Sequence, residues 1–281
     1  MERMQKHVRS VVFAAATAVV MVIPLLCQAT IPAAGQAPQA APRYRASRTA
    51  DGKPDLNGIW QPVNTANWDL QDHAARQGPV ANGAAFSVPP GLGVVEGNEI
   101  PYRPEALAKK KRNAERWLTD DPEIKCFLPG VPRATYQGYP FQIIQMPSDI
   151  LIAYAFDNAS RSIPMNSKRE APVDSWMGWS RGRWEGETLV VDVTGFNDQT
   201  WFDRAGNYHS DALHVVERYT GTSPDHLLYE ATIEDPDVFT RPWKISMPLY
   251  RRVEKNAQLL EFKCVEFAEE FMYGHLKKKT P

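Results

Sequence analysis

The sequence predicts a mainly β protein, an antiparallel meander closed into a barrel, with one helix on its N-terminal side. After Cys126 nearly every apolar run is short, rich in Val, Ile, Tyr and Phe, and bounded by Gly, Pro, Asn or Asp, which is typical of strands. Short links without helical patterns join these runs, and 184–188 is tight enough for a hairpin turn. A sheet of this many strands generally closes, because closure removes its exposed edges.

The elements can be placed in chain order. A helix is expected from about Pro104 to Leu118, since proline occupies its first turn and Leu107, Ala114 and Trp117 fall on one side. Strands are expected at Asp55–Trp60, Phe141–Met146, Ile150–Phe156, Ser162–Met165, Met177–Trp184, Thr188–Val193, Leu213–Tyr219, Leu227–Glu234, Trp243–Tyr250 and Leu259–Val265.

Gly58 and Trp60 form a Gly-x-Trp motif in the strand that precedes the meander. This arrangement resembles the start of the lipocalin and calycin barrels, in which the tryptophan plugs one end and an arginine from a later strand stacks on it. The resemblance implies a lipocalin-like barrel with Arg218 or Arg251 as that arginine. An ordinary core tryptophan is the alternative interpretation.

The composition limits the classes of partner. The chain has 281 residues, of which 43% are hydrophobic, so it can bury a sizeable core. Its 32 basic and 33 acidic residues leave a net charge of -1, which gives no field to attract a nucleic acid or an anionic membrane. The basic clusters 109–112 and 277–279 are interpreted as solvated surface.

The N-terminus predicts export. Basic residues precede an apolar run from Val11 to Leu26, and Cys27-Gln28-Ala29 provides small residues for a signal peptidase. We expect a signal peptide at 1–29, a secreted or periplasmic protein, and no stable membrane insertion after cleavage; a retained anchor and a lipid-bearing Cys27 are alternatives. A disordered Ala/Pro/Gln linker at 30–48, one barrel domain at 49–276 and a basic tail at 277–281 follow. The Gly/Pro-rich stretch 78–101 is expected to be a long loop, either a lid or a disordered flap.

Export changes the meaning of the cysteines. Cys27 leaves with the leader, so Cys126 and Cys264 remain in an oxidising compartment and are expected to form a disulfide to the final strand. Two buried free thiols or a catalytic thiol are the alternatives.

The densest group of candidate acid/base residues lies between 198 and 218. His209 with Asp203 or Glu217 places an imidazole beside a carboxylate, which is what general acid/base catalysis requires. A structural ion pair or a loop-fixing hydrogen bond is the alternative. His209, His214 and Glu217 do not have the spacing of helix-borne zinc sites, so no metal is expected.

Two catalytic or cofactor motifs are rejected. Gly178-Trp179-Ser180-Arg181-Gly182 fits Gly-x-Ser-x-Gly, but a hairpin follows it where a serine hydrolase needs a helix. The chain has neither a P-loop nor a Gly-x-Gly-x-x-Gly fingerprint, so no cofactor is expected.

Aromatic residues flank the expected strands, and a barrel mouth lined by such side chains with a few polar groups is typical of a small-molecule site. Half or more of these aromatics fit the core equally well. The side chains expected to bind a ligand are Trp176, Trp179, Trp201, Tyr139, Arg218, Asp157 and Arg161.

From Cys126 onward the chain resembles a large family of uncharacterised secreted bacterial proteins. The resemblance covers more than half of the chain and carries no established activity, and the short stretch 166–170 departs from it. The matching segments are 126–133, 176–192 (Trp-Met-Gly through Val-Val-Asp), 195–203 (Gly-Phe-Asn-Asp through Asp), 209–218 (His through Glu-Arg), 234–236 and 240–243.

These observations predict an exported, lipocalin-like barrel that binds an apolar or aromatic small molecule. A secreted barrel enzyme acting as a hydratase, isomerase or lyase is the second hypothesis, and a surface protein without a ligand is the third. The sequence does not indicate the oligomeric state.

Overall fold

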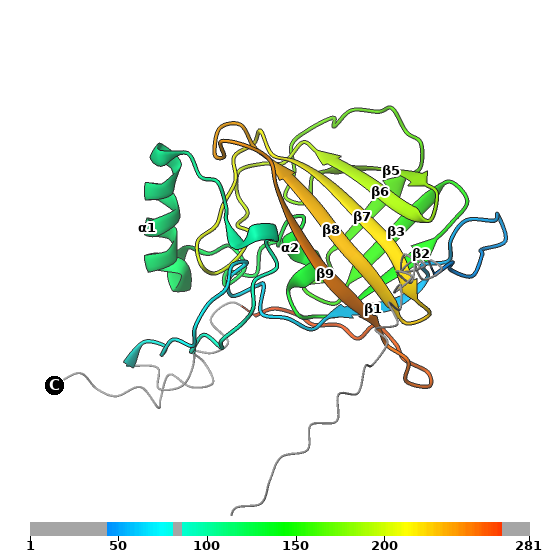
Figure 1. The fold of residues 1–281 in the computed structure, drawn as a ribbon, viewed down its shortest axis with the longest axis horizontal. Coiled ribbons are helices and arrows are strands. Elements are labelled where there is room, and N and C mark those ends of the chain that lie inside the picture. Colours follow the sequence, from blue (N-terminus) through cyan, green and yellow to red (C-terminus); the bar gives the residue numbers. More distant parts are fainter. Residues whose placement is uncertain (1–43, 81–85, 266–281) are drawn as a thin grey trace, which may run out of the picture. The chain divides into compact units, whose positions relative to one another are not determined.

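Nine strands form a single sheet within residues 44–80 and 86–265, the part of the chain that the computed structural model describes (Figure 1). The strands are β1 (Gly58–Pro62), β2 (Phe141–Gln145), β3 (Asp149–Tyr154), β4 (Ser160–Pro164), β5 (Trp179–Glu185), β6 (Thr188–Thr194), β7 (His214–Ser223), β8 (His226–Glu234) and β9 (Trp243–Arg251). Their order is β4-β3-β2-β1-β9-β8-β7-β6-β5, and the sheet closes almost completely. The prediction of a mainly β, lipocalin-like barrel is therefore confirmed.

The described residues belong to one compact unit, Arg43–Pro281. The expected signal peptide at 1–29, most of the expected linker and the basic tail at 277–281 lie outside the described residues.

One of the ten expected strands is wrong. Leu259–Val265 forms no strand, and its Phe262 makes a single bridge to Phe156. The segment cannot bury an alternating face, since Leu260 is 73% and Val265 is 60% exposed.

The barrel has a seam, the line along which the two edge strands of the sheet, β4 and β5, meet. The odd number of strands explains its parallel geometry. All neighbours within the sheet are antiparallel, so β4 and β5, at its two edges, run in the same direction. A parallel bridge joins Met165 to Gly182 there, and Asn166 N donates to Gly182 O at 2.7 Å. A parallel pair needs a crossover of a dozen or more residues, and residues 165–178 provide it.

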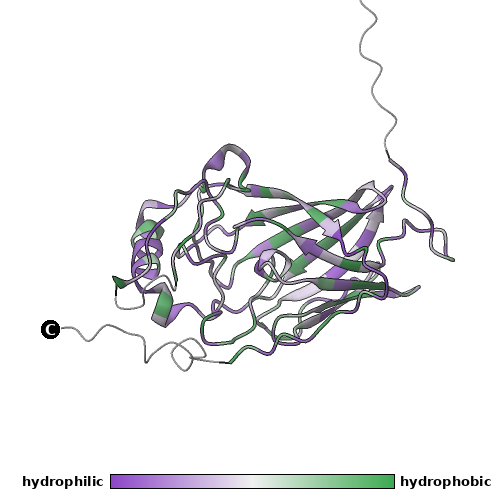
Figure 2. Cartoon of the chain, turned by 90° about the horizontal axis from the view of Figure 1, so that it is seen from below, coloured by the Kyte–Doolittle hydropathy of each residue, from purple (hydrophilic) through white to green (hydrophobic). Residues whose placement is uncertain are grey.

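Alternation along each strand builds the core. In β7, Val215, Glu217 and Tyr219 are fully buried while the residues between them are partly exposed. Such a period of two places alternate side chains inside the barrel. Figure 2 shows the same mixture of hydrophobic and hydrophilic residues along the strands.

Trp60 is fully buried and has an arginine from a later strand against its ring, as the Gly-x-Trp motif implies. Its indole Nε1 donates to Leu56 O at 2.9 Å, and the Arg251 guanidinium lies 4.2 Å from its ring centroid. Gly58 has φ +140°, and a Cβ there would collide with Arg251. The stacking arginine is therefore Arg251, whereas Arg218 forms an ion pair with Glu185 at 2.8 Å.

The helices lie toward the end of the barrel where β9 begins (Figure 1). They are α1 (Pro104–Asp120), α2 (Arg133–Tyr136) and the 3-10 turn η2 (Glu96–Asn98). The expected helix is confirmed by α1, but Ala106 is its buried residue and Leu107 remains 38% exposed.

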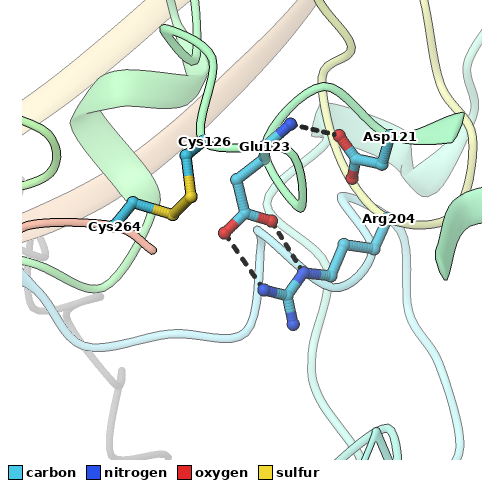
Figure 3. The surroundings of a disulfide bond; sticks show 5 residues. All are labelled: Asp121, Glu123, Cys126, Arg204 and Cys264. Atoms are coloured by element: carbon cyan, nitrogen blue, oxygen red, sulfur yellow. Dashed lines mark hydrogen bonds and ion pairs between the residues drawn. A yellow bond between two sulfur atoms is a disulfide. The ribbon is translucent and has the colours of Figure 1, made fainter. Parts of the chain in front are cut away.

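The Cys126–Cys264 disulfide is present, with its Cα atoms 5.4 Å apart (Figure 3). It joins the turn after α1 to the segment that follows β9. The expectation that Cys264 belongs to a final strand is wrong, because the last strand ends at Arg251.

Candidate functional site

A group of polar side chains lies inside the otherwise apolar barrel. We call Tyr154, Arg161, Glu217, Tyr219 and Tyr229 the interior polar cluster; each is at most 6% exposed. They come from β3, β4, β7 and β8, and strand alternation directs them inward.

Glu217 organises this cluster. Arg161 Nη2 lies 2.6 Å from Glu217 Oε2, and the hydroxyls of Tyr229 and Tyr219 donate to Oε1 at 2.8 and 3.0 Å. Arg161 also donates to the hydroxyl oxygens of Tyr219 at 3.2 Å and Ser180 at 3.5 Å. The carboxylate is thus paired with a cation and two hydroxyl donors, which a buried charge requires.

Electrostatics keeps Arg161 and the tyrosines of the cluster in their protonated forms. Burial lowers the pKa of Arg161. The adjacent Glu217 and the tyrosines together raise it by more, so the pKa lies well above the ordinary value for arginine. Burial, followed by Glu217, raises the pKa of Tyr219 and Tyr229 well above the ordinary value. Arg161 therefore remains cationic and the two hydroxyls remain donors at neutral pH.

A pocket of about 380 Å³ opens at the end of the barrel where β2, β4 and β5 finish. Its apolar side chains include Ile150, Met165 and Trp184. We call it the barrel-end pocket; its lining residues are Thr49, Ala50, Asp51, Lys53, Gln145, Met146, Pro147, Ile150, Met165, Asn166 and Trp184.

The N-terminal segment is fixed beside this pocket by Gln145. The Gln145 side chain accepts from Leu56 N at 2.6 Å and donates to Pro54 O at 3.0 Å, while its backbone N donates to Asn57 Oδ1 at 2.7 Å. Residues 49–53 are thereby held as one wall of the pocket.

The opposite end of the barrel is built from buried ion pairs. Arg133, on α2, donates to both oxygens of Asp121 at 2.8 Å, and Arg204 donates to both oxygens of Glu123 at 2.9 and 3.0 Å. Figure 3 shows Glu123 and Arg204 beside the Cys126–Cys264 disulfide. Burial alone would raise the pKa of Glu123, but Arg204 and Arg133 lower it.

His209 has both ring nitrogens engaged. Nδ1 lies 2.7 Å from Ser210 O, so it must donate, and Nε2, 2.6 Å from Thr200 Oγ1, then accepts from that hydroxyl. Burial lowers the pKa of His209, which favours this neutral form.

Asp203 fixes a loop. It accepts from Leu70 N at 2.9 Å and from Asn207 Nδ2 and N at 2.6 and 3.1 Å. Burial, followed by the nearby Asp69, raises the pKa of Asp203 to about 7. Within residues 44–80 and 86–265, no hydrogen bond or ion pair joins His209, Asp203 or Glu217 to one another.

The other residues expected to bind a ligand are scattered. Two of them stack on other rings: Trp176 on Phe127 and Tyr139 on Phe262. Three make contacts that involve the backbone: Trp179 donates to Arg169 O, Asp157 N donates to Phe262 O, and Trp201 forms a β-bridge with Tyr208. Arg218 forms an ion pair with Glu185. Of the seven, Arg161 is the one that belongs to the interior polar cluster.

Sequence reasoning missed Tyr154, Tyr219, Tyr229 and the pocket residue Met165 as candidates for the site. The period-two pattern of β3 and β8 could have directed Tyr154 and Tyr229 inward. No sequence signal links Trp184 to residues 49–53, because they are brought together by closure of the sheet.

Comparison with protein-family models and with curated proteins finds no match for this chain. Among the described residues, no group of three or more His, Cys, Asp or Glu side chains is arranged to hold a metal ion. No helix in that part of the chain is both long and apolar enough to cross a membrane.

Proposed function

We propose that this protein is an exported barrel that binds an apolar or aromatic small molecule in the barrel-end pocket. The observation that carries the proposal is the pocket itself, about 380 Å³ in volume, beside the seam of the barrel. Sites for small molecules usually fall between about 300 and 1,000 Å³.

The lining of the pocket supports this class of ligand. Trp184, Met165 and Ile150 offer an aromatic ring, a flexible thioether and an aliphatic surface, while Thr49, Asp51, Lys53, Gln145 and Asn166 are polar. The apolar side chains of such a mixed wall select for the shape and apolar area of a ligand, and the polar ones fix its orientation. Methionine adapts to ligands of different shape.

The acid/base enzyme has less support. His209 uses both nitrogens within the protein, and Asp203 accepts three hydrogen bonds, two from Asn207 in its own loop and one from Leu70 N. Structural roles account for both side chains, so we do not propose catalysis by them.

The test is a fluorescence titration with the uncharged probe N-phenyl-1-naphthylamine. We expect the native protein to bind it, and we expect Trp184→Ala to weaken binding by about tenfold, since the indole supplies much of the apolar contact. Trp179→Ala is the matched control, because Trp179 is on the same strand and does not line the pocket.

Absence of probe binding by the folded native protein would refute the proposal, and equal effects of the two substitutions would refute the location. Export is tested separately by N-terminal sequencing of protein recovered outside the cytoplasm. We expect that chain to begin at Thr30, and a chain beginning at Met1 would contradict the signal peptide.

A further inference from the structure

The barrel interior contains polar atoms that have no hydrogen-bond partner in the described part of the chain. Those able to donate include Arg161 Nε and the hydroxyls of Tyr154 and Thr135; Glu217 Oε2 also lacks a hydrogen bond but is held in the ion pair with Arg161. Arg161 is 6% and Tyr154 is 4% exposed, so water does not compensate them from outside. Both side chains belong to the interior polar cluster, and Thr135 reaches it from α2, as its interactions with Tyr154 and Tyr219 show.

These unused atoms have a common chemical character. Arg161 Nε carries a hydrogen and can only donate, while a hydroxyl can donate or accept. A single oxygen acceptor would therefore satisfy Arg161 and a neighbouring hydroxyl together. Buried polar groups are normally paired, so such atoms point to a bound group.

The charge of the cluster decides which acceptor fits. Glu217, 2.6 Å from Arg161, already balances the guanidinium. An anionic ligand would leave one unbalanced negative charge in the interior, which is costly in a medium of low dielectric constant. An uncharged carbonyl adds no charge and supplies two lone pairs.

The seam between β4 and β5 connects the cluster to the barrel-end pocket. Met165 and Trp184 line the pocket, whereas Arg161 and Ser180 lie four residues earlier on the same two chain segments. At about 3.3 Å per residue, four residues span about 13 Å. A ligand that reaches from the pocket to Arg161 must therefore be elongated.

The wall is weakest along this path. Apart from the bond from Asn166 N to Gly182 O, the described backbone hydrogen bonds include none that joins β4 to β5. Gly182 has no side chain, and the space of its missing Cβ is filled by Met165 and Ile163. Rotation of Met165, whose side chain is unbranched and flexible, would open the part of this space that Ile163 does not fill.

We propose that the interior polar cluster binds the uncharged oxygen acceptor, a ketone or ester carbonyl, of an elongated apolar ligand whose other end occupies the barrel-end pocket. This inference rests on the proposed function and assigns its ligand class. Arg161 Nε and the Tyr154 hydroxyl donate to the carbonyl oxygen, and Glu217 excludes carboxylates.

The experiment compares two probes with the same number of carbons, 2-undecanone and undecanoate, by displacement of N-phenyl-1-naphthylamine. We expect the native protein to bind the ketone at least about tenfold more tightly, the factor that one hydrogen bond provides. Glu217→Gln keeps the size and the acceptor oxygen of the side chain but removes its charge, so we expect the preference to shift toward undecanoate by about tenfold or more.

Tyr154→Phe gives a second readout that does not depend on the ion pair. Its hydroxyl makes no hydrogen bond of normal length in the free protein and only interacts with the nearby Thr135 and Arg161, so the variant should fold with little loss of stability. We expect it to bind 2-undecanone about tenfold more weakly and undecanoate unchanged. Tyr136→Phe is the control, because that hydroxyl donates to Phe202 O at 2.9 Å at the end of the barrel beside α2.

The outcomes separate the two proposals. A native protein that binds the naphthylamine probe but does not prefer the ketone overturns this inference and leaves the proposed function standing. A Tyr154→Phe variant that changes both affinities equally also overturns it. A native protein that binds none of the three molecules overturns both proposals.

Discussion

Replacing Arg161 by methionine tests the buried ion pair at the centre of the barrel. Methionine retains most of the length of the side chain but removes its charge, so the main consequence falls on Glu217, which is fully buried. The tyrosine hydroxyls at 2.8 and 3.0 Å would still donate to Oε1, while Oε2 would lose its cation at 2.6 Å. Removing one partner of a buried ion pair, so that the other charge stays unpaired, typically costs about 3–5 kcal/mol. We therefore expect Arg161→Met to lower the free energy of unfolding by about 4 kcal/mol.

The matched variant is Arg161→Met with Glu217→Gln. Glutamine keeps an acceptor oxygen for Tyr219 and Tyr229 without a charge that needs a partner. We expect the double variant to be more stable than Arg161→Met alone by about 2 kcal/mol, because the unpaired charge is gone.

Urea denaturation followed by tryptophan fluorescence measures these differences, with an unchanged m-value as the sign of intact two-state unfolding. A loss below about 1 kcal/mol for Arg161→Met would refute the pairing, because surface ion pairs contribute that little. A double variant no more stable than the single one would show that packing, and not charge, determines the loss.

Three further predictions concern other parts of the fold. Replacing both Cys126 and Cys264 by serine should lower the free energy of unfolding by about 5 kcal/mol in the chain-entropy model, since 138 residues separate the two cysteines. Denaturation of the variant beside the oxidised native protein measures this loss, and an unchanged midpoint would contradict the prediction. Gly58→Ala should lower the free energy of unfolding by about 2 kcal/mol or more, because the new Cβ displaces Arg251 from the ring of Trp60 and the φ of residue 58 is +140°. Thermal melts check this, with Gly52→Ala as the control, since a Cβ at residue 52 meets open space. The pKa of Asp203 is raised to about 7, so this side chain binds its proton more tightly in the folded state. Its contribution to stability is therefore largest below about pH 4 and is lost as the pH rises toward 7, by up to about 1.4 kcal/mol per pH unit. Asp203→Asn should remove this slope of the free energy of unfolding against pH, and a slope that persists in the variant would assign it to another group.

Local patterns were sufficient for most of the fold. Strand periodicity predicted nine strands and Pro104 marked the start of α1, because side-chain alternation and proline geometry are properties of the chain itself. Leu259–Val265 shows the limit of this reasoning. Its apolar composition resembles a strand, but it meets the barrel at a single bridge, and most of its apolar side chains remain exposed.

The candidate site was less predictable. The sequence placed Glu217 beside His209 as an acid/base pair, with a structural ion pair as the alternative. The partner is Arg161, 56 residues earlier in the chain and on a strand at the opposite edge of the sheet. That pairing exists because the sheet curls until its edges meet, which the order of residues along one strand does not reveal.

By itself, the sequence determined the class of fold and the two cysteines that pair, because each depends on short-range pattern or on the absence of another partner. Tertiary structure decided that Arg251 stacks on Trp60, that Arg161 neutralises Glu217, and that Trp184 faces residues 49–53. These contacts depend on closing an odd number of strands, which forces β4 and β5 into a weak parallel seam and places the pocket and the interior polar cluster along it.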